Sequence, residues 1–343
     1  MLYVTTRSNQ EVYSAQKALM ESRSEDGGFY VPFRMPGYSQ AEMRALASKP
    51  FGQCVAEVLN TLFDTKLTAW DVDCTIGRSP IRLHPITQRI VMGELWHNFD
   101  WDFKRTVSDL MKLLTDGKQD NPSDWSLIAI RIAVLFGMFG KLMRRGLVSL
   151  DAPMDVAVLS GDFSGPMALW YAREWGLPIG NIILCCNDNN SPWELLCHGA
   201  IRTGTVAIPT ITPEGDYVIP RDLERFVSAC GGERETLHFV EDCHLGRMYV
   251  PSDLTMEKIR KGMSASVVGQ NRIASAIPNV YSSHGCILEP YTALVYSGMM
   301  DYRTKTGEGR NALILSDRGP GSCTELTASF MGISEEELKM KLK

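Results

Sequence analysis

The stretch MDVAVLSGDFSGPMALWYAREWGLPIGNIILCCN, residues 154–187, constrains the fold of this chain more than any other. It begins with a run of Val, Ala and Leu, passes through the turn SGDFSG, continues with a helical pattern, breaks at GLP and ends in a second apolar run. An unbroken apolar run fits a strand that is covered on both faces, and a strand–helix–strand unit joins two parallel strands of such a sheet. The stretch therefore predicts an α/β fold built on a parallel sheet.

The turn after the first of these strands has the composition of an anion site. Small residues let a ligand approach the backbone, and the N–H groups at a helix start, with the positive end of the helix dipole, favour a phosphate. The spacing is neither GxGxxG nor a P-loop, so a tight strand-to-helix turn without a ligand is the alternative. The predicted phosphate-binding residues are Ser160, Gly161, Asp162, Phe163, Ser164 and Gly165.

Lys104 lies in or just before the first turn of a predicted amphipathic helix, because apolar residues recur after it at three- and four-residue steps, from Val107 to Leu114. Most lysines are solvated surface groups, but an amine at a helix start among aromatic neighbours can serve as a nucleophile. A lysine and a phosphate-binding turn together suggest pyridoxal phosphate. That cofactor needs a Schiff-base lysine, a phosphate cradle and a partner for its pyridine nitrogen.

Composition limits the classes of partner. The 343 residues, 44% of them hydrophobic, carry a net charge of −5, which argues against a nucleic-acid or anionic-membrane surface and favours a small-molecule substrate. Nine cysteines without a CxxC pair favour reduced thiols. The sequence opens without a basic and apolar leader pattern, and its longest apolar run, residues 127–139, contains Arg131 and is too short to span a bilayer. We expect a cytoplasmic protein with no membrane partner.

Segments in the same order along the chain resemble the threonine synthases, which are pyridoxal-phosphate enzymes of the tryptophan-synthase-β (fold type II) group. YVTTRS and SEDGGFYVP resemble the family's STRG and DGGLYVP-like opening, and ELWHNFDWDFKR, residues 94–105, resembles its ELFHGPTxAFKD signature. VLSGDFSGPMALWYAREWGLPI, residues 158–179, resembles the PSGNFGxxxAGxxAxxxGLPI stretch. NIILCCNDNN, LLCHGAI and LEPYTAL resemble the ATNxND segment, the turn after it and DPHTAV or EPHAAV. Each fragment alone is weak evidence, but their shared order is specific.

The resemblance implies a fold type II α/β architecture and a role for each matched residue. Lys104 takes the Schiff-base (aldimine) position, and the turn at 160–165 holds the cofactor phosphate. Asn187 becomes a cofactor contact, with a purely structural role in its own turn as the alternative. His97 takes the family's histidine position as a substrate contact, and packing among aromatic residues is its alternative. The implied reaction is that of a carbon–oxygen lyase in threonine biosynthesis, in which O-phosphohomoserine or a related amino acid loses phosphate by γ-elimination and water is added at the β-carbon.

The chain also departs from the family pattern. Between residues 105 and 155 the small domain is largely missing, together with the loop that holds the substrate, and we divide the chain into a threonine-synthase-like N-terminal region, 1–85, and a pyridoxal-phosphate-binding α/β domain, 86–343. The lysine signature carries the residues Asn-Phe-Asp at 98–100 in place of Gly, Pro and Thr. Asp162 replaces an asparagine, and its charge opposes phosphate unless the side chain turns away to cap the following helix.

The last departure lies in LSDRGPGSC, residues 315–323. Asp317 stands where the family's threonine hydroxyl meets the pyridine nitrogen, and a carboxylate there would keep that nitrogen protonated. Arg318 is new and would meet an anionic substrate. These changes leave two alternatives open, a pyridoxal-phosphate enzyme with a different amino-acid substrate and a non-catalytic binding or regulatory protein derived from a threonine synthase.

Neither a metal site nor an oligomeric state follows from the sequence. His238, Cys243 and His244 lack the usual spacing of metal ligands, so we expect no metal. A homo-oligomer is possible, because a partner subunit would complete the shortened active site.

Overall fold

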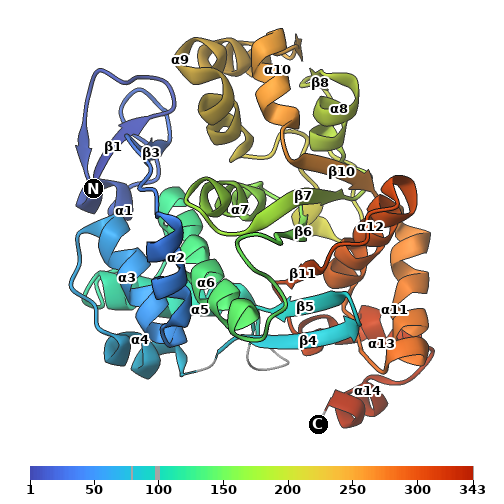
Figure 1. The fold of residues 1–343 in the computed structure, drawn as a ribbon. Helices are drawn as coiled ribbons and strands as arrows, with labels where there is room; N and C mark the ends of the chain where they lie inside the picture. The colour runs from blue at the N-terminus through green and yellow to red at the C-terminus, as the bar shows by residue number, and fades with distance from the viewer. Residues whose placement is uncertain (79, 97–100, 343) are drawn as a thin grey trace.

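A twisted sheet of six strands organises the chain (Figure 1). The computed structural model describes residues 1–78, 80–96 and 101–342. Strand order is β10-β7-β6-β11-β5-β4, with every neighbouring pair parallel except β5 and β4 at the edge. The strands are β4 (Arg82–Thr87), β5 (Ile90–Glu94), β6 (Met154–Leu159), β7 (Ile179–Cys186), β10 (Met263–Val267) and β11 (Ala312–Ser316). The predicted α/β class with a parallel-rich sheet is therefore confirmed.

Helices cover both faces of this sheet. The helices α5 (Phe103–Leu114), α6 (Asp124–Arg144) and α7 (Ser164–Glu174) lie toward one face, and α11 (Gln270–His284), α12 (Pro290–Thr306), α13 (Thr324–Met331) and α14 (Glu335–Leu342) follow on the other side. On β11, Leu313 and Leu315 enter the apolar cluster of the first face, while Ala312 and Ile314 enter the cluster around α11 and α12. This alternation is the reason that the buried strands read as continuous apolar runs.

The unit predicted from residues 154–187 forms as expected. β6 leads through a short turn into α7, and β7 returns parallel to β6 with Val158 opposite Leu184 and Leu159 opposite Cys185. Phe163 has a left-handed φ of 73° immediately before α7, which reverses the chain sharply. The turn therefore lies at the carboxyl end of an inner strand, where parallel sheets bind ligands.

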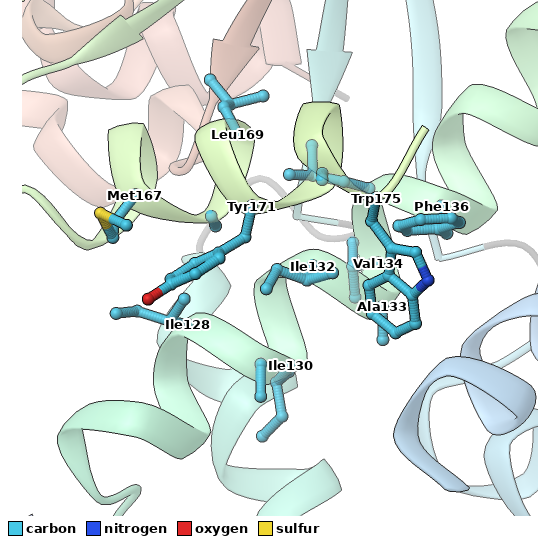
Figure 2. Close-up of a cluster of buried hydrophobic side chains, with 14 of the residues drawn as sticks. Ile128, Ile130, Ile132, Ala133, Val134, Phe136, Met167, Leu169, Tyr171 and Trp175 are labelled. Atoms are coloured by element: carbon cyan, nitrogen blue, oxygen red, sulfur yellow. The ribbon is translucent and has the colours of Figure 1, made fainter. Parts of the chain in front are cut away.

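Helix α6 packs beside α7 in the core (Figure 2). Phe136 of α6 meets Trp175 edge to face, with ring centroids 5.1 Å apart, and Ile128 and Ile132 lie toward the Tyr171 side of α7. At 21 residues, α6 is long and apolar enough to cross a membrane, so the expectation that this segment is too short was wrong. Its most apolar window is 83% buried inside the fold, which is the pattern of a core helix.

The N-terminal region packs against α6. A three-stranded sheet, in the order β2-β1-β3, and four helices make up this part of the chain. Their bounds are β1 (Leu2–Thr5), β2 (Tyr13–Ser14), α1 (Ala15–Met20), β3 (Tyr30–Pro32), α2 (Gln40–Ser48), α3 (Phe51–Phe63) and α4 (Ala69–Ile76). Gly137 of α6 lies so close to the Phe51 ring that a Cβ at 137 would come within 2.6 Å of it. The two regions thus share one apolar core.

Several elements lie between β7 and β10 along the chain. They are α8 (Ser191–His198), β8 (Ile201–Arg202), the 3₁₀ turn η1 (Pro213–Gly215), α9 (Leu223–His244), β9 (Met248–Tyr249) and α10 (Asp253–Arg260), and a second 3₁₀ turn, η2 (Pro320–Cys323), follows β11. Of these, α8, β8, α9 and α10 are labelled in the upper part of Figure 1. The segment at 105–155 holds α5, α6 and the first residues of β6 and no additional sheet. Loss of the small domain stays a prediction. The predicted division at residue 85 falls inside β4, so a boundary there would cut a paired strand.

Glu94, the last residue of β5, makes the stability of this fold depend on pH. Its side chain is buried, and burial raises its pKa from 4.5 to about 7, although the charge of Arg82 acts in the opposite direction. His84 lies nearby, with its Nδ1 3.7 Å from Glu94 Oε1. Between pH 4.5 and 7 the folded state therefore binds more protons than the unfolded state, and stability falls as pH rises through that window.

We expect Glu94→Gln to be more stable than the parent at pH 8, by about 1–3 kcal/mol, and to show little difference at pH 4.5. Urea unfolding at several pH values measures the change. Glu336→Gln, at an exposed glutamate of α14, is the control and should follow the parent curve. A pH dependence that is the same in all three proteins would contradict the assignment.

Candidate functional site

A pocket lies at the carboxyl ends of β6 and β11, between the first residues of α5 and α7, and encloses about 750 Å³ of empty space that is partly open to solvent. Ligands of α/β sheets bind in this position. The predicted site residues that line it are Lys104, Asp317, Arg318 and, from the turn, Ser160, Gly161, Asp162, Ser164 and Gly165. Residues that are far apart in the sequence thus meet at one place.

Residues of the turn before α7 line this pocket. The Ser160 N–H bonds the Cys185 carbonyl, and the Phe163 N–H bonds the Ser160 carbonyl, which closes the turn. The N–H groups of Gly161, Asp162 and Gly165 have no protein partner in the described chain. Backbone donors at the start of a helix are the usual ligands of a phosphate group.

Phe163 does not line the pocket. Its side chain is 1% exposed and packs on Phe226 of α9, with ring centroids 5.6 Å apart. The ring therefore anchors the turn to α9, and only the backbone of this residue belongs to the predicted phosphate cradle.

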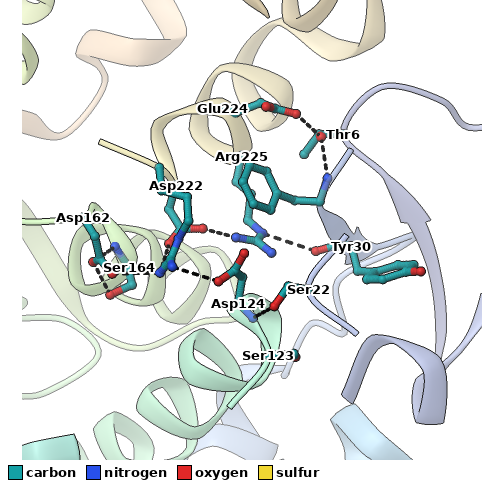
Figure 3. Close-up of polar contacts among 12 residues, drawn as sticks. Thr6, Ser22, Tyr30, Ser123, Asp124, Asp162, Ser164, Asp222, Glu224 and Arg225 are labelled. Carbon is teal, nitrogen blue, oxygen red and sulfur yellow. Dashed lines mark hydrogen bonds and ion pairs between the residues drawn. The ribbon is translucent and has the colours of Figure 1, made fainter. Parts of the chain in front are cut away.

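The carboxylate of Asp162 is bound by the protein itself. Its Oδ1 accepts hydrogen bonds from the Ser164 N–H, at 3.0 Å, and from Ser164 Oγ, at 2.6 Å. Its Oδ2 accepts from Arg221, at 2.8 Å, and Arg221 also pairs with Asp124 at the start of α6. Figure 3 shows Asp162 beside Ser164, with Asp124 and Asp222 nearby. The side chain turns to the helix start, as the capping alternative requires, and an arginine offsets its charge.

Lys104 follows the first residue of α5, where the helix start adjoins the end of β11. The Phe103 N–H donates to the Asp317 carbonyl at 2.7 Å. The Lys104 side chain is 69% exposed, and its amine lies 2.5 Å from Glu214 Oε1 of η1. Glu214 also pairs with Arg318. Burial alone would raise the pKa of Glu214, but the hydrogen bond from Lys104 and the charge of Arg318 hold it below its ordinary value.

Arg131 of α6 binds the carboxylate of Asp317 through two hydrogen bonds, of 2.7 and 2.9 Å. The Arg131 side chain is buried, and its guanidinium lies 4.4 Å from the centre of the Phe103 ring. Its Nε has no hydrogen-bond partner in the described chain. A paired and oriented carboxylate thus faces the pocket, and its predicted contact with a pyridine nitrogen stays a prediction.

Asn187 lies outside the pocket lining. It is fully buried, and its side-chain amide donates to Thr210, Thr212 and Asp216. A Cβ on Gly215 would come within 2.7 Å of this amide, so the loop that carries η1 closes tightly on Asn187. Asn187 therefore acts as a loop clamp, because its side chain holds the loop that carries η1 closed. This is the structural role that the sequence left open as the alternative to a cofactor contact. The other predicted substrate contact, His97, lies outside the described residues.

Three charged residues of the site escaped sequence reasoning. Arg131 carried a signal, because it is the charge that interrupts an apolar run, but the sequence does not reveal its partner. Glu214 and Arg221 carried none, since TPEGD and PRD read as ordinary loop sequences. No group of three or more His, Cys, Asp or Glu side chains in the described chain is placed to bind a metal ion, and His238 pairs with Asp242 instead.

Comparisons with known proteins find similarity to threonine synthases. Residues 2–79 match the model of the threonine synthase N terminus. Threonine synthase-like 1 of Homo sapiens is 24% identical over 181 residues, which are 51% of this chain and 24% of that protein. Threonine synthase of Pseudomonas aeruginosa is 22% identical over 179 residues, 51% of this chain and 36% of that protein. The matches therefore cover well under half of either relative's length.

Solved structures agree with the sequence comparison. Pyridoxal-phosphate-bound threonine synthase from Brucella melitensis superposes with a TM-score of 0.85 at 17% identity, over 97% of this chain and 92% of that one. Yeast threonine synthase gives a TM-score of 0.82 at 17% identity, over 99% and 93% of the two chains. The fold is thus the fold type II architecture that the resemblance implied. Together with the match of the N-terminal region, it makes this chain similar to the threonine synthases over its first 79 residues in sequence and over nearly its whole length in fold.

Proposed function

We propose that this protein is a pyridoxal-phosphate-dependent enzyme of the threonine synthase type. Its substrate would be O-phosphohomoserine or a related amino acid with an anionic leaving group. The observation that carries the proposal is the meeting, in one pocket, of the Lys104 amine, the open N–H groups of the turn before α7 and the charged pair Asp317 and Arg318. The Brucella relative, which contains pyridoxal phosphate, supports the choice of cofactor.

The residues present fit this cofactor. Lys104 offers an exposed primary amine for its aldehyde, and the turn offers backbone donors for its phosphate. The charge of Asp162, which would repel a phosphate, is held by Ser164 and Arg221. When bound, the cofactor supplies an electron sink for the α-carbon of an amino acid.

The side chains of the pocket divide the remaining work. The Lys104 amine, once it releases Glu214, would carry protons between substrate carbons. Arg318 would bind an anionic group of the substrate through its planar guanidinium. Asp317, oriented by Arg131, would offer a fixed carboxylate at the end of β11. Because Lys104 is 69% exposed, these residues alone do not exclude water from the amine.

The Lys104–Glu214 ion pair also favours a second candidate, a non-catalytic binding protein in which the lysine serves only as a structural partner. For both candidates we propose a cytoplasmic protein with reduced thiols, whose ligands are small molecules rather than nucleic acid or a membrane. Treatment with cofactor separates the two, because only the enzyme requires a covalent bond at Lys104.

The decisive variant is Lys104→Ala, compared with Lys112→Ala on the exposed face of the same helix. With pyridoxal phosphate, the parent and Lys112→Ala should develop a visible absorbance band, and borohydride should fix the cofactor on the peptide that contains Lys104. Lys104→Ala should show neither result. Release of inorganic phosphate from O-phosphohomoserine by the parent then tests the substrate. If the band is absent at saturating cofactor, the non-catalytic candidate stands.

Asp162 gives a second prediction, because an asparagine there would keep the hydrogen bond to Ser164 and lose the charge. We expect Asp162→Asn to bind pyridoxal phosphate about three- to tenfold more tightly, since a carboxylate no longer lies beside the phosphate. Tryptophan fluorescence measures the affinity. Pyridoxal, which lacks the phosphate, should bind both proteins equally, and Asp151→Asn, at an exposed loop position, should match the parent. If pyridoxal also bound Asp162→Asn more tightly than the parent, by the same factor, the phosphate would not lie beside residue 162.

A further inference from the structure

Glu214 joins two cations that enter the pocket from different elements. Lys104 reaches it from α5, and Arg318 reaches it from the segment after β11. One carboxylate oxygen, Oε1, contacts both groups. An acidic group thus lies at the point where these two cations converge.

Two other carboxylates of the pocket wall have arginine partners of their own. Asp162 is held by Arg221, and Asp317 by Arg131. Asp102 forms an isolated β-bridge with Arg318, and its side chain has no ion pair among the described residues. Within the described residues Glu214 is therefore the carboxylate that forms ion pairs with both Lys104 and Arg318, and its departure would remove both ion pairs.

The backbone around Glu214 is fixed. The Asp216 carboxylate accepts hydrogen bonds from the Thr210 N–H and from the side-chain amides of Asn187 and Asn189. These bonds close the loop on both sides of η1. The Glu214 side chain itself is 40% exposed, so it can rotate into solvent without any opening of the loop.

Arg318 would keep its place after such a rotation. Its guanidinium lies 4.6 Å from the centre of the Tyr291 ring, and its side chain is 16% exposed. A cation held on an aromatic face remains oriented when its counterion leaves. The subsite is therefore built from one fixed cation, Arg318, and one mobile cation, Lys104.

We propose that Glu214 is an internal competitor, which occupies the subsite for a second acidic group of the substrate, phosphate or carboxylate, and rotates out when that group binds Arg318 and Lys104. The inference rests on the proposed function for the identity of this substrate, an amino acid with an additional acidic group. A doubly charged phosphate matches two cations better than one carboxylate does. Ligands without such a group would leave Glu214 in place, with the Lys104 amine still occupied.

The test uses inorganic phosphate and the full chain without cofactor. We expect Glu214→Gln to bind phosphate about five- to tenfold more tightly than the parent by titration calorimetry, because the competing charge is gone. Trinitrobenzenesulfonate should also label Lys104 several-fold faster in this variant, measured by peptide mass spectrometry. Glu241→Gln, at an exposed glutamate paired with Arg247, is the control and should match the parent in both assays.

Addition of Arg318→Ala to Glu214→Gln should abolish the gain in phosphate affinity. If the glutamine variant fails to fold, Glu214→Asp provides the same test with a smaller gain, since its carboxylate is one methylene shorter. Equal phosphate affinity in the parent and in these variants, or a gain that survives loss of Arg318, would overturn the proposal. Since the assays contain no pyridoxal phosphate, a chain that fails to bind the cofactor can still pass this test.

Discussion

The junction between the end of β11 and the start of α5 is the contact on which the candidate site depends. The Phe103 N–H bonds the Asp317 carbonyl, and the Gly319 N–H bonds the Trp101 carbonyl. These backbone bonds connect an inner strand of the sheet to the helix that carries Lys104. The charged side chains of the pocket are neighbours because the main chain brings them together, so their own attractions do not have to build the site.

Ion pairs around the first turn of α9 connect the site with the N-terminal region. Arg221 binds Asp162 in the turn before α7, and Glu224, one turn further along the chain, accepts hydrogen bonds from Arg7 and Thr6. Figure 3 shows the bond between Glu224 and Thr6. A bond to a partly buried carboxylate is stronger than an exposed pair because water screens it less. Side chains at the start of α9 therefore fix the position of the turn before α7 relative to β1.

Local patterns predicted the fold, the helix that begins beside Lys104 and the turn before α7, while long-range pairing was not predictable from them. The unit at 154–187 and the helix after Lys104 form as expected, because apolar periodicity depends on residues a few positions apart. The partners Glu214, Arg131 and Arg221 come from other elements, and nothing in their neighbouring sequence specifies which charge they meet. Asn187 shows the same limit, since its place after a strand fits both a ligand contact and a loop clamp.

The close contact between Gly137 and the Phe51 ring has a consequence for how this protein can vary. The glycine leaves the space that the ring fills, so a larger residue at 137 fits only if the residue at 51 becomes smaller. The two positions belong to the N-terminal region and to the helix that also carries Arg131. Exchange of the first region for one that carries a different residue at position 51 would therefore disturb α6, the helix that carries Arg131, unless position 137 changed with it.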